Sequence, residues 1–162
     1  MNQAVNFFWT IFCFIPVIGF WATSGMMIYC YCFIAVSILI LLLPSKWLQL
    51  SRKPKFYEGL GVKLIRKFVQ NGDFVNRYIR KGKPAYRIVA DRASAVKYIN
   101  TILMYERYHL MCFVFFLLTA VYVMMISQYA MAVIILLANI IYNICPILLQ
   151  QYNRARVKKL AR

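Results

Sequence analysis

Residues 110–149, LMCFVFFLLTAVYVMMISQYAMAVIILLANIIYNICPILL, contain no Asp, Glu, Lys or Arg, and this stretch decides the class of fold. An α-helix crosses the hydrocarbon core of a bilayer with about 20 residues, so the stretch is about twice as long as one crossing requires. Ser127 and Gln128 form the only polar pair near its middle, where a tight turn fits. We therefore expect two membrane-spanning helices, at about residues 110–126 and 129–149.

A second apolar stretch, at residues 5–43, also lacks charge. The polar run Thr23, Ser24 and Gly25 predicts a turn between two further spans, at about residues 5–21 and 26–43. A cleaved signal peptide is the competing interpretation, but it requires a basic segment at its start, and the chain begins MNQAV. We therefore expect two more spans here.

The distribution of charge predicts how these spans are oriented. Apolar residues make up 63% of the chain, above the roughly 45–50% of soluble proteins, and the net charge is +16. All 20 Lys and Arg residues lie within residues 46–107 and 154–162. Basic segments stay on the cytoplasmic side, so we expect a multi-pass protein of the cell inner (plasma) membrane with both termini in the cytoplasm.

The fold expected from these patterns is an all-α integral membrane protein with four transmembrane helices in two hairpins. An amphipathic, basic cytoplasmic layer separates the hairpins. The expected segments are a transmembrane hairpin at 1–44, a basic amphipathic interfacial region at 45–107, a second transmembrane hairpin at 108–150 and a basic cytoplasmic tail at 151–162.

The interfacial region has a helical pattern at its start. Within residues 56–70, apolar residues recur every fourth position, which predicts one amphipathic helix at the membrane surface: Phe56, Leu60, Leu64 and Phe68. Residues 86–90 are predicted to form a strand or an extended segment. Asp91 or Ser94 can then cap a helix that continues through Glu106 into the third span.

The scarcity of acidic and metal-binding side chains excludes several functions. A di-iron site in a helical bundle uses about four carboxylates and two His, whereas this chain has four scattered carboxylates and one His. The five cysteines lie in apolar segments and are interpreted as packing residues, so no metal site and no metal cofactor is expected. A nucleic-acid partner is not expected, because every basic residue adjoins the membrane and no nucleic-acid-binding motif is present.

One pair of residues has the composition of a catalytic dyad. His109 is the only His and lies at the mouth of the third span, and Glu106 precedes it by three residues. On a helix the two share a face, where the Glu106 carboxylate can accept a hydrogen bond from one imidazole nitrogen and orient the other towards a substrate. The alternative is an interfacial His with a solvated Glu.

The fourth span carries a polar stripe. At about 100° per residue, a regular helix places Asn139, Asn143, Gln150, Asn153 and Arg154 on one side. Such amides either line a site or form hydrogen bonds between helices. With a turn at residues 127 and 128, His109 comes level with about residue 146, so the dyad and the stripe are expected to face one cytosolic cleft.

Basic residues follow the stripe in the tail. Arg154 and Arg156 are candidates for a bidentate clamp on the phosphates of a donor. The remaining basic residues of the tail are expected to bind anionic membrane lipids: Lys158, Lys159 and Arg162.

Several motifs together resemble one family. They are YEGLGVK at 57–63, ERYH at 106–109, Asn143 and QQYNRAR at 150–156. From about residue 43 to 156 the chain resembles the glycosyl-4,4'-diaponeurosporenoate acyltransferase family, and the last motif is the most specific. The resemblance implies transfer of a fatty acyl group to a sugar hydroxyl of a glycosylated carotenoid acid. The His-x-x-x-x-Asp box of soluble glycerolipid acyltransferases is absent, since Val114 stands where its Asp would be.

The function expected is therefore a membrane acyltransferase that acts on a hydroxyl of a lipid-linked acceptor, a glycolipid or glycosyl-carotenoid-like molecule. Acyl-CoA is the expected co-substrate and no other cofactor is foreseen. His109 would be the general base and Glu106 its orienting partner, with Asn143 or Gln150 stabilising the oxyanion. The expected substrate-binding residues are Asn139, Asn143, Gln150, Tyr152, Asn153, Arg154 and Arg156. The alternative is a non-catalytic membrane subunit or scaffold that binds anionic lipid or a partner protein.

Overall fold

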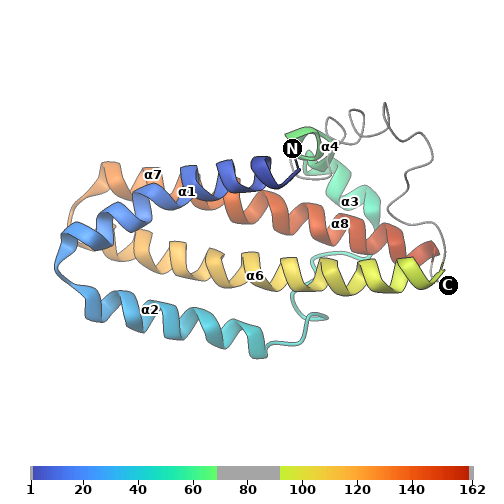
Figure 1. The fold of residues 1–162 in the computed structure, drawn as a ribbon, viewed down its shortest axis with the longest axis horizontal. Helices are drawn as coiled ribbons and strands as arrows, with labels where there is room; N and C mark the ends of the chain where they lie inside the picture. Colours follow the sequence, from blue (N-terminus) through green and yellow to red (C-terminus); the bar gives the residue numbers. More distant parts are fainter. Residues whose placement is uncertain (1, 69–91, 161–162) are drawn as a thin grey trace.

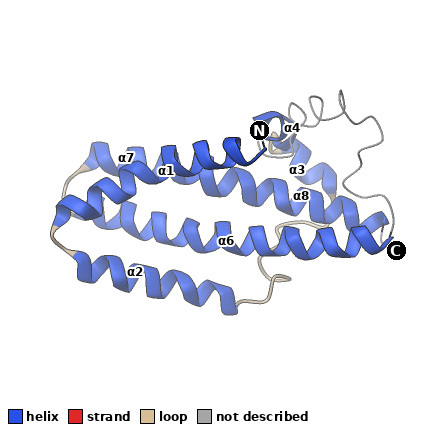
Figure 2. Cartoon of the chain, in the orientation of Figure 1, coloured by secondary structure: helices blue, strands red, loops and turns tan. Residues whose placement is uncertain are grey.

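The structure is a computed structural model that describes residues 2–68 and 92–160. Every regular element in these residues is helical, and no strand occurs among them (Figure 2). In chain order they are α1 (Asn2–Ser24), α2 (Met27–Leu39), the 3₁₀ turn η1 (Ile40–Leu42), α3 (Pro54–Gly59), α4 (Val62–Phe68), α6 (Arg92–Met125), α7 (Tyr129–Asn139), the π-helical turn η2 (Ile140–Ile144) and α8 (Cys145–Leu160). The segment expected to be extended, residues 86–90, lies outside the described residues, as does Asp91.

Two tight turns lie at the same end of the molecule (Figure 1). Gly25, with φ of +67°, joins α1 to α2, and Ser127, with φ of 62°, joins α6 to α7. Left-handed backbone costs a residue with a side chain about 1–2 kcal/mol, which a glycine avoids. The chain thus reverses direction at both polar interruptions of its apolar stretches.

Three helical segments are long and apolar enough to cross a membrane. They are Ala4–Ser24, Ala93–Met125 and Tyr129–Lys158, the last formed by α7, η2 and α8 together. The remaining apolar segment, Met27–Leu42, is shorter, and we calculate a length of about 25 Å against a hydrocarbon core of about 30 Å. α6 continues unbroken from the charged region into the apolar bundle, as its sequence predicts.

The amphipathic helix expected at residues 56–70 is instead two short helices. α3 starts at Pro54, whose fixed φ suits the first turn of a helix, and it ends before Gly61. Gly61 has a φ of +77°, so the chain turns there before α4 begins. The single-helix prediction was wrong because an apolar residue at every fourth position does not reveal a left-handed glycine inside the pattern.

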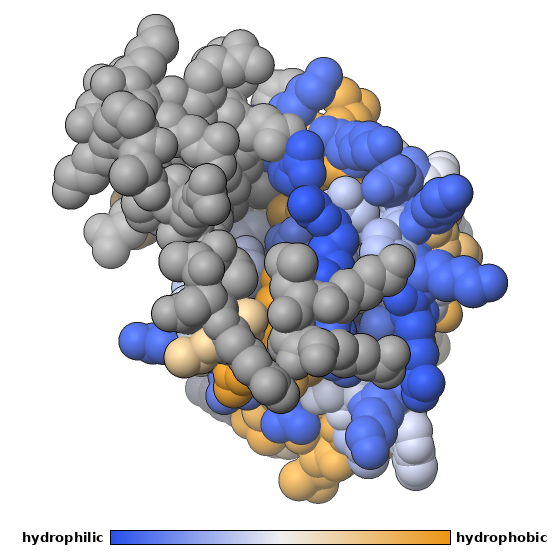
Figure 3. Space-filling view, turned by 90° about the vertical axis from the view of Figure 1, so that its right-hand side faces the viewer, coloured by the Kyte–Doolittle hydropathy of each residue, from blue (hydrophilic) through white to orange (hydrophobic). Residues whose placement is uncertain are grey.

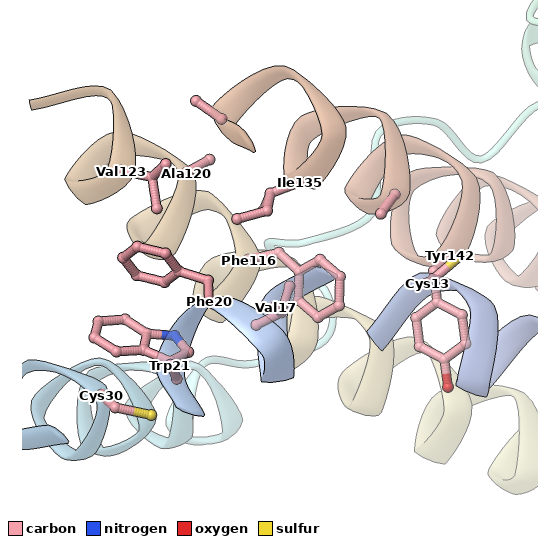
Figure 4. Packing of buried hydrophobic residues seen from close by; sticks show 12 residues of the cluster. Cys13, Val17, Phe20, Trp21, Cys30, Phe116, Ala120, Val123, Ile135 and Tyr142 are labelled. Atoms are coloured by element: carbon pink, nitrogen blue, oxygen red, sulfur yellow. The ribbon is translucent and has the colours of Figure 1, made fainter. Parts of the chain in front are cut away.

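α6 occupies the centre of the bundle, between α2 on one side and α1, α7 and α8 on the other (Figure 1). At the end with the two turns, the ring of Trp21 stacks on that of Tyr122 and its indole donates a hydrogen bond to Thr119 Oγ1 at 3.2 Å. Phe116 lies fully buried in the same cluster (Figure 4). Cys13 and Cys30 pack there as apolar residues, in line with their expected role.

The opposite end of the bundle is polar. Figure 3 looks onto this end and shows hydrophilic side chains over much of the surface that the described residues form there. The helices α3 and α4, the connection 44–53 and the end of α8 meet here. The two turns and the charged end therefore lie at opposite ends of the long axis.

Candidate active site

A buried ion pair joins α6 to α8 at the charged end. Glu106 Oε1 accepts hydrogen bonds from Arg154 Nη2 at 3.2 Å and from Gln151 Nε2 at 2.8 Å. The side chains of Glu106 and Arg154 are each 2% exposed. Removing one partner of such a pair leaves a buried charge without compensation, which typically costs 3–5 kcal/mol.

The Gln151 side-chain amide contacts three other segments of the chain. Besides Glu106, its Nε2 donates to the Leu48 carbonyl at 2.8 Å. Its Oε1 lies 3.1 Å from the Leu50 amide nitrogen and 3.1 Å from the Tyr57 hydroxyl. Both donors of the amide are used, and its oxygen accepts from the Leu50 amide and shares the single hydrogen of the Tyr57 hydroxyl with the Ser51 carbonyl. Gln151 thereby ties α8 to α6, to the connection 44–53 and to α3.

Tyr57 closes this network on the side of α3. Its ring is fully buried, and its hydroxyl lies 2.7 Å from the Ser51 carbonyl and 2.9 Å from the Ser51 amide nitrogen. Burial raises the pKa of Tyr57, so the phenol stays protonated at neutral pH and keeps its donor.

Arg154 links the network to Ser45, near the start of the connection 44–53. Its Nη1 donates to the Ser45 carbonyl at 3.3 Å, and Arg107 Nε donates to Ser45 Oγ at 3.2 Å. Among the described residues, Arg154 Nε and Glu106 Oε2 are buried without a hydrogen-bond partner. The guanidinium and the carboxylate thus meet through one atom each.

His109 belongs to a second network, deeper in the bundle. Its Nδ1 lies 3.5 Å from Asn143 Oδ1, and Asn143 Nδ2 donates to Asn139 Oδ1 at 2.8 Å. Asn139 Nδ2 in turn donates to the Phe113 carbonyl at 3.2 Å. His109 is buried, with 9% of its surface exposed.

The direction of this amide chain assigns the protons on His109. The Phe113 carbonyl can only accept, so it orients the Asn139 amide, whose oxygen then orients the Asn143 amide. Asn143 therefore presents its oxygen to His109, and Nδ1 must carry the proton. Nε2 is left with its lone pair, which is the state that a general base requires.

The hydrogen bond expected between Glu106 and His109 is not formed. The two side chains leave the same side of α6, but Arg154 offers Glu106 a full positive charge, which a neutral imidazole does not. Asn143 contacts His109 in its place. The expected orientation of the imidazole is thus produced by a residue of the polar stripe.

The π-helical turn η2 changes which residues of the last helix face α6. One extra residue in a turn rotates everything after it by about 100° relative to a regular helix. This rotation brings Gln151 onto the face that the regular pattern assigned to Gln150 and keeps Arg154 close to it. Gln151 is buried and Gln150 is half-buried. Pro146, which lacks an amide hydrogen, was the sequence signal for an irregular turn at this place.

The other expected site residues lie around these two networks. Tyr152 is buried and donates to Glu58 Oε1 at 3.2 Å, while Asn153 is half-buried. Arg156 is exposed, and its guanidinium lies 5.3 Å from the centre of the Tyr152 ring. Arg154 and Arg156 point to different sides of α8, since residues two apart on a helix differ by about 200°. The structure does not bring them together as a clamp.

Sequence reasoning missed three residues that contact the site. Besides Gln151 these are Tyr57 and Tyr142, whose aromatic rings resembled ordinary packing residues in an apolar sequence. In the described residues, no group of three or more His, Cys, Asp and Glu could hold a metal ion. The arrangement offers an imidazole that is in contact with the Asn143 side chain, which suits proton transfer from a hydroxyl.

Comparisons with known proteins give one result. The family model described as glycosyl-4,4'-diaponeurosporenoate acyltransferase matches residues 43–162. No curated protein and no solved structure matches the chain. The matched residues include both networks, whereas α1, α2 and η1 all precede them.

Proposed function

Because the chain belongs to the glycosyl-4,4'-diaponeurosporenoate acyltransferase family, we propose that it transfers a fatty acyl group from acyl-CoA to a hydroxyl of a lipid-linked sugar. The acceptor is a glycolipid or a glycosyl-carotenoid-like molecule. The observation that carries the proposal is the amide chain from the Phe113 carbonyl to His109, which leaves Nε2 free to accept a proton.

In the proposed reaction, His109 Nε2 takes the proton of the acceptor hydroxyl as its oxygen attacks the carbonyl carbon of the thioester. The tetrahedral intermediate collapses, the carbon–sulfur bond breaks, and the imidazolium returns its proton to the thiolate of CoA. The products are the acyl ester and free CoA, and His109 ends in its starting state. Asn143 is the positioning residue that holds the tautomer.

Glu106 acts through the fold rather than on the substrate in this proposal. Its bonds to Gln151 and Arg154 set the position of α8 against α6 and therefore the position of Asn143 relative to His109. Arg156, which is exposed, is the better candidate for the phosphates of the donor, because the Arg154 guanidinium is committed to Glu106 and Ser45.

The proposed placement in the membrane follows from the ends of the bundle. The two turns face the outside of the plasma membrane, and the charged end faces the cytoplasm together with both termini. α2 completes the crossing as the fourth and shortest span. The basic residues around α3, α4 and α8 form a layer that binds anionic lipid headgroups and admits acyl-CoA from the cytosol.

One observation favours a second function. The network of Glu106, Gln151 and Arg154 is buried and joins α6 to α8, and a non-catalytic subunit could use the same contacts to hold its helices together. A scaffold of this kind would bind anionic lipid or a partner protein but no acyl donor.

The test combines ligand binding with product formation in protein purified in detergent or nanodiscs. Long-chain acyl-CoA should raise the unfolding temperature, by an amount equivalent to about 2.7 kcal/mol at a hundred times Kd, whereas CoA alone and free fatty acid should raise it less. Radiolabelled acyl chains should then appear on the glycolipid acceptor as an ester. A protein that neither binds acyl-CoA nor forms the ester would be the scaffold.

A further inference from the structure

A chain of hydroxyl groups lies beside His109 and links three helices. The Tyr142 hydroxyl, from η2, lies 2.9 Å from Thr10 Oγ1 of α1 and 3.3 Å from the Tyr108 hydroxyl of α6. The rings of Tyr108 and Tyr142 each lie 5.3 Å from the imidazole of His109, centre to centre. The two rings that carry these linked hydroxyls therefore both contact the imidazole that is proposed to act as base.

The direction of the hydroxyl chain follows from its last member. Thr10 Oγ1 donates its single hydrogen to the Asn6 carbonyl at 2.9 Å, so towards Tyr142 it can only accept. Tyr142 must then donate to Thr10 and accept from Tyr108. Tyr108 is consequently the donor at the open end of the chain.

The bond made by Tyr108 is the weakest of the chain. Hydroxyl pairs usually lie about 2.7–2.8 Å apart, so 3.3 Å is long. The Cys112 thiol, a second neighbour of this hydroxyl, is a weak hydrogen-bond partner. Tyr108 is 39% exposed on the outer surface of an apolar bundle. A substrate carbonyl oxygen that reaches Tyr108 from the bilayer or from the charged end can accept its hydrogen bond. The weak bond to Tyr142 is then replaced by a stronger bond to the carbonyl oxygen.

The residues foreseen for oxyanion stabilisation have other partners or positions. The Asn143 amide donates to Asn139 and directs its oxygen to His109, and the π-helical turn rotates Gln150 away from α6. A thioester attacked beside His109 still requires a donor for the negative charge on its oxygen. Loss of one such donor typically lowers kcat by about 10²–10³.

We propose that the Tyr108 hydroxyl is the oxyanion donor: it binds the carbonyl oxygen of the acyl donor and stabilises the negative charge that develops there. Tyr142 and Thr10 are positioning residues that direct the hydroxyl chain. The inference rests on the proposed acyl transfer, and it gives α1 a part in the site although α1 precedes the residues that match the family model. No proton leaves Tyr108 in the step, since it only donates a hydrogen bond.

The first experiment measures acyl transfer by Tyr108→Phe, which retains the ring and its contact with His109. We expect kcat to fall by about 10²-fold, while the KM for the acceptor and the pH dependence set by His109 stay unchanged. Tyr142→Phe should lower kcat less, because it removes an orienting group. Tyr105→Phe is the matched control, since Tyr105 lies on the same helix and is 38% exposed, and it should keep wild-type activity.

The second experiment needs no turnover. It compares binding of a ketone analogue of acyl-CoA, in which CH₂ replaces the sulfur, with an S-alkyl-CoA that lacks the carbonyl. Wild type should bind the ketone about two- to tenfold more tightly, the effect of one hydrogen bond, and Tyr108→Phe should bind both equally.

The outcomes separate the two proposals. If His109→Ala abolishes transfer but Tyr108→Phe behaves as Tyr105→Phe in both experiments, the role of Tyr108 is refuted and the proposed function stands. If wild type binds neither analogue and forms no ester, the proposed function fails and this inference fails with it.

Discussion

At the scale of residues, Glu106 and His109 lie three positions apart on α6 but belong to separate networks. The side chain of Glu106 contacts a guanidinium and an amide at the charged end, whereas His109 contacts the side chains of Asn143 and Tyr142. The sequence could identify both residues, because a lone His and a carboxylate beside an apolar span are conspicuous. It could not assign their partners, since these come from α8 and depend on how that helix is rotated.

The buried ion pair of Glu106 and Arg154 predicts how substitutions of these two residues change the free energy of unfolding. Glu106→Ala should lower the free energy of unfolding by about 3–5 kcal/mol, because the Arg154 guanidinium is left buried without its counter-charge. The double variant Glu106→Leu, Arg154→Leu should recover part of this loss. Urea unfolding of detergent-purified protein measures both.

Glu58→Ala provides the control, because it removes only a partly exposed ion pair with Lys63 and the acceptor of the Tyr152 hydroxyl. It should lower stability much less than Glu106→Ala does. If the double variant loses as much stability as the Glu106 and Arg154 single variants lose together, the charges of Glu106 and Arg154 do not compensate each other.

At the scale of elements, the π-helical turn η2 determines the geometry of the site. Polar residues that interrupt the apolar stretches predicted the turns at residues 23–25 and 127–128. The periodicity of a regular helix placed Gln150 on the face towards α6, where the structure has Gln151, because no irregular turn was assumed in the last span. Pro146 indicated an irregularity, but which turn takes the extra residue depends on contacts with α6 and α1.

Removal of the extra residue should separate folding from activity. Deletion of Ile141, which is exposed, would convert η2 to regular helix while Gln151 and Arg154 keep their orientation towards Glu106. Asn143, which lies inside η2, would be displaced around the helix axis by part of the roughly 100° that one residue contributes, and would lose its contact with His109. We expect near-normal thermal stability with acyl transfer reduced by at least about 10²-fold, part of the contribution of a general base.

The control is deletion of Leu148, which lies after η2 and should turn Gln151 and Arg154 away from Glu106. This variant should unfold at a lower temperature than the Ile141 deletion. Full activity of the Ile141 deletion would contradict the role given to Asn143.

At the scale of the whole molecule, the apolar stretches predicted an all-helical bundle, and the described residues confirm it. Length and hydropathy support three crossings, and the fourth expected crossing is the shorter Met27–Leu42. Sequence could predict the class of fold because burial in lipid requires helices, but it could not give the order of packing around α6. That order depends on side-chain contacts between distant segments, such as Trp21 with Tyr122.

The proposed orientation of the bundle predicts which positions water-soluble thiol reagents should reach. In a background without the five native cysteines, Ala4→Cys and Lys158→Cys should react only from the cytoplasmic side. Met26→Cys and Gln128→Cys, at the two turns, should react only from outside. Labelling of Ala4→Cys and Lys158→Cys from opposite sides would indicate an odd number of crossings and would rule out α2 as a span.

The central claim is that His109, held by Asn143, is the general base of an acyl transfer. The measurement that tests it most directly is the rate of ester formation from acyl-CoA by purified His109→Ala, with Tyr105→Phe as the folded control on the same helix. We predict that His109→Ala keeps its unfolding temperature and its affinity for acyl-CoA but loses about two to four orders of magnitude in kcat. A His109→Ala variant that forms ester at the wild-type rate would contradict the claim.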